Sequence, residues 1–385
     1  MKIITKPAAM DPREFYDVSA LAPLEKLLFV DIETTGFSAK TSMLYLIGAA
    51  CYSPMGDGET KPDTWRIIQW FAEDFNEERD LLEAFFRFAS GYSHLIHFNG
   101  NQFDLPFIRK RCEILGIPYP FDSFTGTDIY KRVTPLKKLL RLENCKQKSV
   151  EDFLGLHRED QYNGGQLIAV YEGFVRSGRA GAPKEVLEEF TKPILLHNFE
   201  DMQGMLEILP ILSFADLFLK PLKPLKVVDV SGSSDDIPEK ASKKELVISL
   251  SLPSPLPKKV LFVKEGCSFS GEGESGVLKV PVYSGELKYF YPNYKDYYYL
   301  PAEDAAIHKS VAVYADSAHR EKAKACNCYT RKQGDFLPQW SPAVEPVFRS
   351  SYDSPALFFE LTDELHNDAE FFSGYAAHIL SMFAS

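Results

Sequence analysis

The sequence predicts an α/β protein of two domains: a mixed five-stranded sheet flanked by helices, then a β-rich α+β domain. Three observations predict this architecture. The chain has 385 residues, which is more than one core usually holds. Up to about Phe218, strand-like and helix-like segments are interspersed. A small polar stretch follows, and after it the segments are mostly short and strand-like. We therefore expect domains at 1–225 and 245–385, joined by a linker at 226–244.

Five segments of the first domain are typical of strands. They are rich in aliphatic and aromatic residues, and they lie at 27–30, 44–52, 64–72, 93–98 and about 124–130. Asn76 is a typical N-cap for a helix that carries an apolar stripe including Leu81 and Phe85. A second helix is expected at 105–115, before Gly116. Since three strands precede the first helix, the sheet is expected to be mixed rather than all parallel.

The second domain follows a stretch whose composition is that of a linker, Ser231–Pro238. Five strand-like segments come next, at 245–252, 259–263, 277–283, 289–300 and 310–314, and a helix is expected near the C-terminus. The segment 289–300 is unusually aromatic, with Tyr289, Phe290, Tyr291, Tyr294, Tyr297, Tyr298 and Tyr299. Such rings can stack on nucleic-acid bases. We favour the other interpretation, half-buried positions in a sheet.

Composition narrows the class of protein. The chain has 43 Lys and Arg against 54 Asp and Glu, so its formal net charge is −11. That charge argues against a histone-like protein held to nucleic acid by bulk attraction. The N-terminus shows no signal-peptide pattern and no run of 18 apolar residues occurs, so we expect a cytoplasmic protein without a membrane span. Six cysteines are too few for a disulfide scaffold, and the single Cys326–Cys328 pair is a weak zinc signal.

Two carboxylates end the first predicted strand. Asp31 and Glu33 are two residues apart, so in an extended chain they point to the same face. Carboxylates held this close repel one another unless a cation lies between them, and hard oxygen ligands suit Mg²⁺ or Mn²⁺. The alternative is a loop in which one acid caps a turn and the other is solvated. The position at the end of a buried strand favours a metal site.

Two further points on the chain carry acidic residues. Asp104 follows the strand 93–98 and starts a helix, where an aspartate also serves as an N-terminal cap. His197 and Asp201 are four residues apart and share one face of a later helix. A histidine beside an apolar stripe is usually structural. Each of these positions alone is therefore weak evidence for a catalytic site. Taken together, their order and their placement on strands and helices match one known arrangement.

That arrangement resembles the DEDD superfamily of 3′–5′ exonucleases, which has a ribonuclease-H-like fold. More narrowly, the chain resembles the YprB-type ribonuclease-H-like family, over roughly residues 24–215. The segments that carry the resemblance are 31–36, 98–106, 128–130, 149–155 and 197–201. One feature departs from the wider superfamily. Its third motif usually has Tyr with three residues before Asp, or His with four, whereas here His197 stands with three before Asp201.

The resemblance implies a two-metal hydrolysis of phosphodiester bonds, with two Mg²⁺ or Mn²⁺ ions. Asp31 is then the carboxylate shared by both ions, and Glu33 and Asp201 complete one site. Asp104 holds the second ion, partly through water. His197 orients or deprotonates the attacking water, a task suited to a side chain that titrates near neutral pH.

Substrate contacts are implied at two places. Thr34, Thr35 and the backbone at Gly36 are expected to seat the terminal nucleotide, and Asn101 is expected to bind substrate. Between Lys131 and Lys148 lie seven cations opposed only by Glu143, among them Lys131, Arg132, Lys137 and Lys138. Such a patch can follow a phosphate backbone. A solvated helical face is an equally good interpretation.

The function implied is a cytoplasmic, metal-dependent 3′–5′ exonuclease of DNA or RNA, acting on single-stranded 3′ ends. A structure-specific endonuclease on the same fold is a close alternative. A second alternative, from another class, is a catalytically silent module that binds nucleic acid or protein. The presence of all four carboxylates argues against the silent module. The altered spacing at His197 and the acidic net charge are consistent with it.

Overall fold

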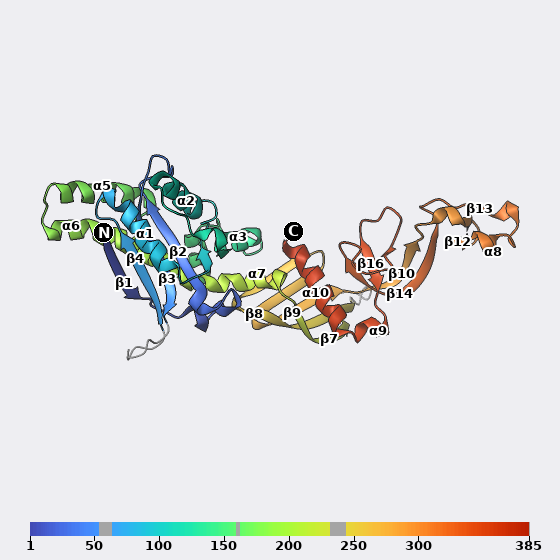
Figure 1. The fold of residues 1–385 in the computed structure, drawn as a ribbon. Helices are drawn as coiled ribbons and strands as arrows, with labels where there is room; N and C mark the ends of the chain where they lie inside the picture. Colours follow the sequence, from blue (N-terminus) through green and yellow to red (C-terminus); the bar gives the residue numbers. More distant parts are fainter. Residues whose placement is uncertain (54–63, 159–161, 232–243, 385) are drawn as a thin grey trace. The chain divides into compact units, whose positions relative to one another are not determined.

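The structure is a computed structural model, and it describes residues 1–53, 64–158, 162–231 and 244–384. The chain divides into two compact units, Met1–Ala215 and Asp216–Ser385 (Figure 1). From the sequence, the first domain was expected to end at residue 225. A linker was expected at 226–244, but residues 226–231 belong to the strand β7, Lys223–Ser231, and most of the rest lies outside the described residues.

The first unit is built on a mixed sheet in the order β1-β4-β3-β2-β5-β6. Its strands are β1 Lys2–Pro7, β2 Leu27–Thr34, β3 Leu44–Ser53, β4 Thr64–Phe71, β5 His94–His97 and β6 Thr125–Asp128. The β2–β5 and β5–β6 pairs are parallel and the other pairs are antiparallel. The mixed sheet is as expected, but it has six strands instead of five. The strand missed was β1, which is mostly exposed at the sheet edge and so lacks the apolar pattern of a buried strand.

Helices cover both faces of this sheet (Figure 1). The helices of this unit are α1 Glu78–Ala89, α2 Asp104–Leu115, α3 Ile129–Val133, α4 Gln147–Leu154, α5 Gly164–Arg179 and α6 Lys184–Glu207, and α7 Leu212–Leu219 runs across its boundary. In β4, Trp70 packs against Phe85 of α1, whereas the next residue, Phe71, packs against Tyr171 of α5. Because neighbouring strand residues face opposite ways, α1 and α5 lie on opposite faces.

The helix α6 packs on the same face as α5. Gln69 of β4, which points the same way as Phe71, donates a hydrogen bond to the carbonyl of Leu195 in α6. Lys184–Leu219 is the segment of the described chain that is long and apolar enough to cross a membrane, yet 83% of its most apolar part is buried within the protein. Burial of that kind is the property of a core helix.

The second unit holds three small sheets and the C-terminal helix α10, Ala369–Ala384. One sheet consists of β7, β8 Lys244–Lys264 and β9 Cys267–Pro281. A closed barrel follows in the order β10-β14-β16-β15, formed by Tyr283–Phe290, Tyr329–Gln339, Leu357–Glu360 and Phe348–Arg349. The third sheet contains β11 Tyr297–Leu300, β12 Ala305–His308 and β13 Glu321–Lys322, and two short helices, α8 Lys309–Ala312 and α9 Asp363–His366, complete the unit.

Three expectations for this unit were wrong in detail. The segment 289–300 is not one strand, because β10 ends at Phe290 and a short 3-10 helix, Tyr294–Asp296, precedes β11. The segments 245–252 and 259–263 form one long strand, β8, whose pairing with β9 slips where prolines interrupt it, between Ser251 and Val260. The expected strand at 310–314 includes most of the helix α8. Its start is fixed by His308, whose Nδ1 accepts a hydrogen bond from the Ser310 amide.

Candidate metal centre

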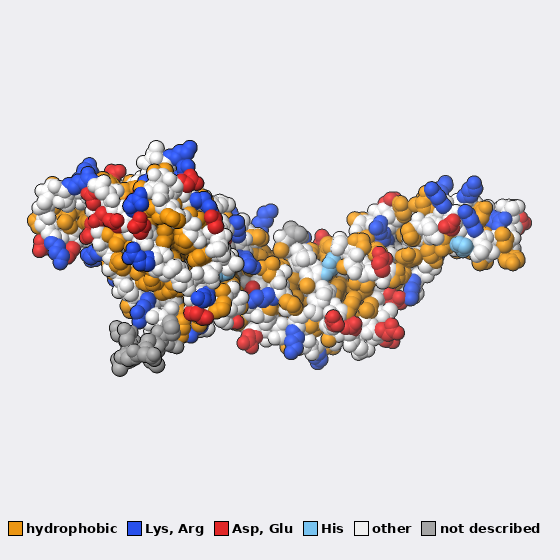
Figure 2. Space-filling view, viewed as in Figure 1, with side chains coloured by type: hydrophobic (Ala, Val, Ile, Leu, Met, Phe, Trp, Pro, Cys, Tyr) orange, Lys and Arg blue, Asp and Glu red, His pale blue; other side chains and the backbone are white. Residues whose placement is uncertain are grey.

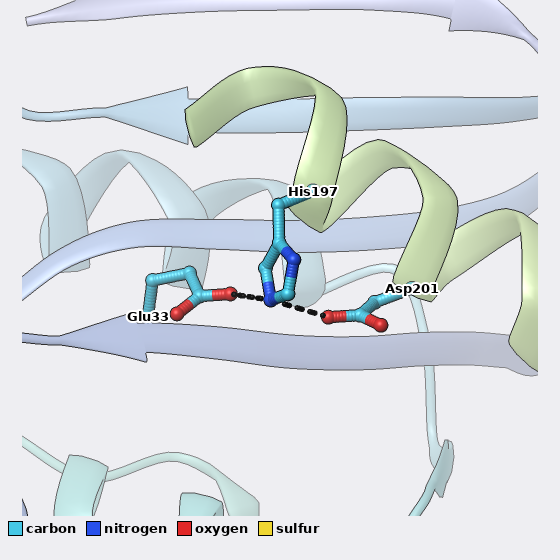
Figure 3. Close-up of side chains that lie close together, drawn as sticks. All are labelled: Glu33, His197 and Asp201. Carbon is cyan, nitrogen blue, oxygen red and sulfur yellow. Dashed lines mark ion pairs between the residues drawn. The ribbon is translucent and has the colours of Figure 1, made fainter. Parts of the chain in front are cut away.

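The acidic residues meet where β2 is covered by α6 and flanked by β5. Asp31 and Glu33 are both on β2, and Asp201 projects from α6 (Figure 3 shows Glu33, His197 and Asp201). Asp104 starts α2 a few residues after β5, which runs parallel to β2. Parallel neighbours end at the same edge of a sheet, so the segment after β5 comes to lie beside Asp31. The Asp104 carboxylate accepts a hydrogen bond from the backbone amide of Ile32.

His197 lies between two of the carboxylates. Its Nε2 is 3.5 Å from Oε1 of Glu33 and 3.3 Å from Oδ2 of Asp201 (Figure 3). One potential ligand atom from each of the three residues lies within 4.8 Å of the others, which is close enough for a single cation to contact all three. His197 and Glu33 are buried and Asp201 is half-buried, so a cation there would be largely shielded from solvent.

The electrostatics of the cluster favour a cation. Burial raises the pKa of Asp31 well above its usual value, and the charges of Asp201, Asp104 and Glu33 raise it further. Burial also raises the pKa of Asp104 to about 7, in spite of hydrogen bonds from backbone amides. Carboxylates that repel one another in this way are stabilised in their ionised form by a bound cation. These oxygen donors fit the hard ions Mg²⁺ and Mn²⁺.

A buried amide on α6 fixes the orientation of Asp31. Asn198 is fully buried, and its Nδ2 donates a 3.0 Å hydrogen bond to Oδ2 of Asp31. Its Oδ1 accepts a 3.0 Å hydrogen bond from Nε2 of Gln69. Gly48, which pairs with Asp31 across the β2–β3 ladder, leaves the space for this amide: a Cβ there would lie 2.8 Å from Asn198 Nδ2. Asn198 lies within the segment 197–201 that carries the family resemblance, but the sequence predicted no role for it.

An arginine holds Asp201 from the other side. Arg158 forms an ion pair with Oδ1 of Asp201, and its Nε donates a 2.5 Å hydrogen bond to Oε2 of the buried Glu151. Gln147 joins the same network, since its Nε2 donates to Oε1 of Glu151 and to the backbone carbonyl of Asp201. Nothing in the local sequence signalled Arg158, because it lies beyond the end of α4 and outside any periodic pattern.

Asp128 supports the segment that carries Asp104. Its Oδ1 accepts a 2.9 Å hydrogen bond from the amide of Asn99, whereas its Oδ2, 3.8 Å from Nδ1 of the buried His97, accepts none from the described residues. The amide of Gly100 in turn donates to His97 Nδ1. Asn99 adopts a φ of 64°, in the left-handed region that Asn tolerates better than most residues. These contacts fix the turn between β5 and α2, and with it the position of Asp104.

The expected substrate-binding residues lie in several settings. Thr34 donates a hydrogen bond to the carbonyl of Gly36, and Thr35 accepts one from the amide of Met43, so both hydroxyls hold the turn after β2. Asn101 is exposed in the turn before α2. The four basic residues Lys131, Arg132, Lys137 and Lys138 are exposed on and after α3. Lys131 is near enough to the cluster's supporting residues to help lower the pKa of His97, although burial is the main cause.

Residues 28–212 match the family model of the RNase_H superfamily. This unit is ribonuclease-H-like. The matched range includes all four carboxylates and His197, and RNase H-like nucleases usually use divalent metals. The match and the acidic cluster together support a nuclease-like function. They do not single out the YprB-type family or the DEDD type, so both of these stay predictions.

Two DNA polymerases are also similar to parts of the chain. DNA polymerase 1 of Aeropyrum pernix is 23% identical over 137 residues, which are 36% of this chain and 14% of that protein. The structure of the family B DNA polymerase from the hyperthermophilic archaeon Pyrobaculum calidifontis covers 68% of this chain and 33% of its own, with 12% identity and a TM-score of 0.36. A TM-score of this size does not establish a shared fold. The chain spans only a minor part of either polymerase.

Proposed function

We propose that this protein is a metal-dependent 3′–5′ exonuclease that hydrolyses phosphodiester bonds of single-stranded DNA or RNA. The observation that carries the proposal is the convergence of Asp31, Glu33, Asp104 and Asp201, with His197 among them, on one face of a ribonuclease-H-like sheet. The family match supports the nuclease class. The 3′–5′ direction and the two-metal scheme rest on the resemblance to the DEDD superfamily.

The carboxylates have distinct roles in this proposal. Asp31 is influenced by the charges of the other three acids, as expected of a group shared between two ions. Glu33 and Asp201 would complete one site, and Asp104 would hold the second ion. When bound, two Mg²⁺ or Mn²⁺ ions would stabilise the charge on the attacking and leaving oxygens.

His197 is the proposed base. Its Nε2 lies 3.3 Å from Asp201 Oδ2 and 3.5 Å from Glu33 Oε1, so the two carboxylates orient the ring. With those carboxylate oxygens bound to the ions, a His197 ring nitrogen that carries neither a proton nor an ion would accept a proton from the attacking water and release it to solvent. The turn at Thr34–Gly36, with Asn101, would seat the terminal nucleotide, and the basic residues from Lys131 to Lys138 would follow the strand. A cytoplasmic location completes the proposal, supported by six free cysteines.

One observation favours the silent module as a second candidate. The Arg158 guanidinium pairs with the carboxylate of Asp201, and a cation already occupying part of that carboxylate competes with a metal ion. Metal binding discriminates between the two candidates, because a silent module of this kind would bind no divalent ion at millimolar concentration.

The direct test incubates 5′-labelled single-stranded DNA and RNA with the wild-type protein and Mn²⁺. A ladder of products shortened from the 3′ end is expected, and Asp31→Asn should reduce hydrolysis to background. Glu189→Gln, which removes an exposed charge from the same helix as Asp201, serves as a matched control with wild-type activity. Hydrolysis that persists in Asp31→Asn would reject the metal assignment. Cleavage of circular single-stranded DNA would reassign the protein as an endonuclease.

A further inference from the structure

The barrel of the second unit carries a cavity of about 750 Å³. This volume lies within the range of about 300–1,000 Å³ that is usual for ligand sites. Aromatic side chains dominate its walls, namely Tyr289, Phe290, Tyr291, Tyr294 and Tyr352, and Arg349 lies among them. In Figure 2, hydrophobic side chains lie among both basic and acidic ones over this part of the chain.

The rings are held in place by packing against one another. Tyr291 is stacked on Tyr297 with ring centres 4.5 Å apart, and Tyr289 meets the Tyr291 ring edge-on at 5.3 Å. Phe290 meets Tyr352 edge-on at 5.5 Å. Tyr289 and Phe290 in β10, and Tyr291 and Tyr294 after it, are half-buried, and Tyr352 is 41% exposed. Tyr289, Phe290, Tyr291 and Tyr352 are therefore held by ring contacts and still partly accessible, as in a stacking platform.

Hydrogen bonds within the protein also hold the polar side of the cavity in place. The buried Gln339 donates to the carbonyl of Val344 and accepts from the amides of Ala343 and Val344, which fixes the loop after β14. Arg349 donates one hydrogen bond to the carbonyl of Tyr352. A guanidinium has five N–H donors, so this contact orients Arg349 without using up its capacity.

A row of cations crosses the strands on the sheet face that Phe290 shares, whereas Tyr289, next to Lys288 in the chain, points to the opposite face. Lys288 on β10 pairs directly with Arg349 on β15 and with Arg331 on β14. Directly paired side chains lie on the same face of a sheet at about 4.5–5.5 Å between Cβ atoms, and like charges at that spacing are destabilising. The positive charge of Arg331 is compensated by ion pairs with Asp304 and Glu286. The Lys288 ammonium lies over the Tyr329 ring, 4.0 Å from its centre, which stabilises part of its charge, and an anion bound near Lys288 and Arg349 would relieve the remaining repulsion between those two.

We infer that this cavity and the adjoining cation row bind a single-stranded polynucleotide, with bases stacked on the tyrosines and phosphates along Lys288 and Arg349. The assignment rests on the nuclease function proposed above, which makes such a strand the substrate. Aromatic rings beside a line of cations match the alternation of bases and phosphates in a strand. The two acids in the wall, Glu345 and Asp353, would keep phosphates out of the cavity itself and can accept hydrogen bonds from base amino groups.

Binding is tested on the full-length chain carrying Asp31→Asn, in EDTA, so that no hydrolysis occurs. The fluorescence anisotropy of labelled oligo(dT) and oligo(U) gives the affinity. Tyr352→Ala and Tyr294→Ala are each expected to weaken binding about five- to hundredfold, the usual effect of removing one stacking ring, whereas Tyr352→Phe should not. When the logarithm of the binding constant is plotted against the logarithm of the salt concentration, Lys288→Gln should make the slope shallower by about 0.7. That is the change expected for the loss of one phosphate contact to a single strand. Tyr314→Ala removes a tyrosine that is 91% exposed and outside the cavity, and should have no effect.

Three results would overturn the inference. The first is oligonucleotide affinity that the tyrosine and lysine variants leave unchanged. The second is binding of a mononucleotide as tight as that of the strand, and the third is Tyr352-dependent binding of a proline-rich peptide in place of the strand. Failure of the nuclease proposal is recognised separately. In that case the chain with Asp31 intact would hydrolyse no dinucleotide or longer strand with Mn²⁺, while the effects of the tyrosine variants on binding would remain.

Discussion

Removal of the Asn198 side chain should disturb both the stability of the first unit and the metal centre. The amide is fully buried and makes two hydrogen bonds, one to the Asp31 carboxylate and one from Gln69. A bond to a charged group contributes about 1.5–3 kcal/mol and a neutral one about 0.5–1.5 kcal/mol. Asn198→Ala should therefore lower the free energy of unfolding by about 2–4.5 kcal/mol. It should also weaken Mn²⁺ binding about 10- to 100-fold, because Asp31 loses its orienting partner.

Gly48→Ala disturbs the same contact from the opposite side. The added Cβ would lie 2.8 Å from Nδ2 and 2.9 Å from Cγ of Asn198, and overpacking of this kind costs about 1–3 kcal/mol. In the Asn198→Ala background those atoms are gone, so the added methyl group fills part of the space. The double variant should then be less destabilised than the sum of the two single variants, by about 1–3 kcal/mol.

Urea unfolding followed by tryptophan fluorescence measures these differences. Trp65 and Trp70 are both buried in the core of the first unit, so their emission reports its unfolding. Mn²⁺ titration of the same four proteins gives the effect on the metal centre. Additive free energies, with Gly48→Ala as costly in the Asn198→Ala background as in the wild type, would refute the contact between Gly48 and Asn198.

Two further predictions concern buried charges in the first unit. Glu78→Ala should lower the free energy of unfolding, measured in urea, by about 3–5 kcal/mol. The substitution leaves the half-buried Arg111 guanidinium without the carboxylate that accepts two of its hydrogen bonds. A loss below about 1 kcal/mol, typical of an exposed pair, would contradict this. Gly204→Ala should lower the free energy of unfolding by about 1–3 kcal/mol and weaken Mn²⁺ binding, because the new Cβ would collide with the Glu151 carboxylate. Gly178→Ala is the matched control: its Cβ would meet only Leu187 at 3.9 Å, so equal losses in both variants would count against the collision.

The central part of the fold could be predicted because its signals are local. An apolar run identifies β2, and the two-residue period of a strand places Asp31 and Glu33 on one face. The four-residue spacing of His197 and Asp201 likewise places them on one side of α6, where the structure brings both near Glu33. On β2 and α6, the spacing of residues in the sequence therefore predicts correctly which side chains lie on the same face.

The missed features depend on contacts that no local pattern encodes. Asn198 meets Gly48 and Asp31 across distant parts of the chain, and an asparagine in an apolar helix has no signature of that role. The same holds for the partnership of Arg158 with Asp201. The tyrosines of 289–299 were expected to be half-buried sheet residues, and they are half-buried. That Tyr289, Tyr291 and Tyr294 line a cavity depends on the loop that carries Tyr352, more than 50 positions further along the chain.

The central claim is that Asp31, Glu33, Asp104 and Asp201 form a divalent-metal centre, and calorimetric titration with Mn²⁺ tests it most directly. Wild-type protein is expected to bind two Mn²⁺ ions at micromolar to millimolar concentration, and Asp31→Asn is expected to lose both, since Asp31 is the proposed shared ligand. Glu189→Gln should bind as the wild type does. Absence of Mn²⁺ binding by the wild type, or unchanged binding by Asp31→Asn, would contradict the claim.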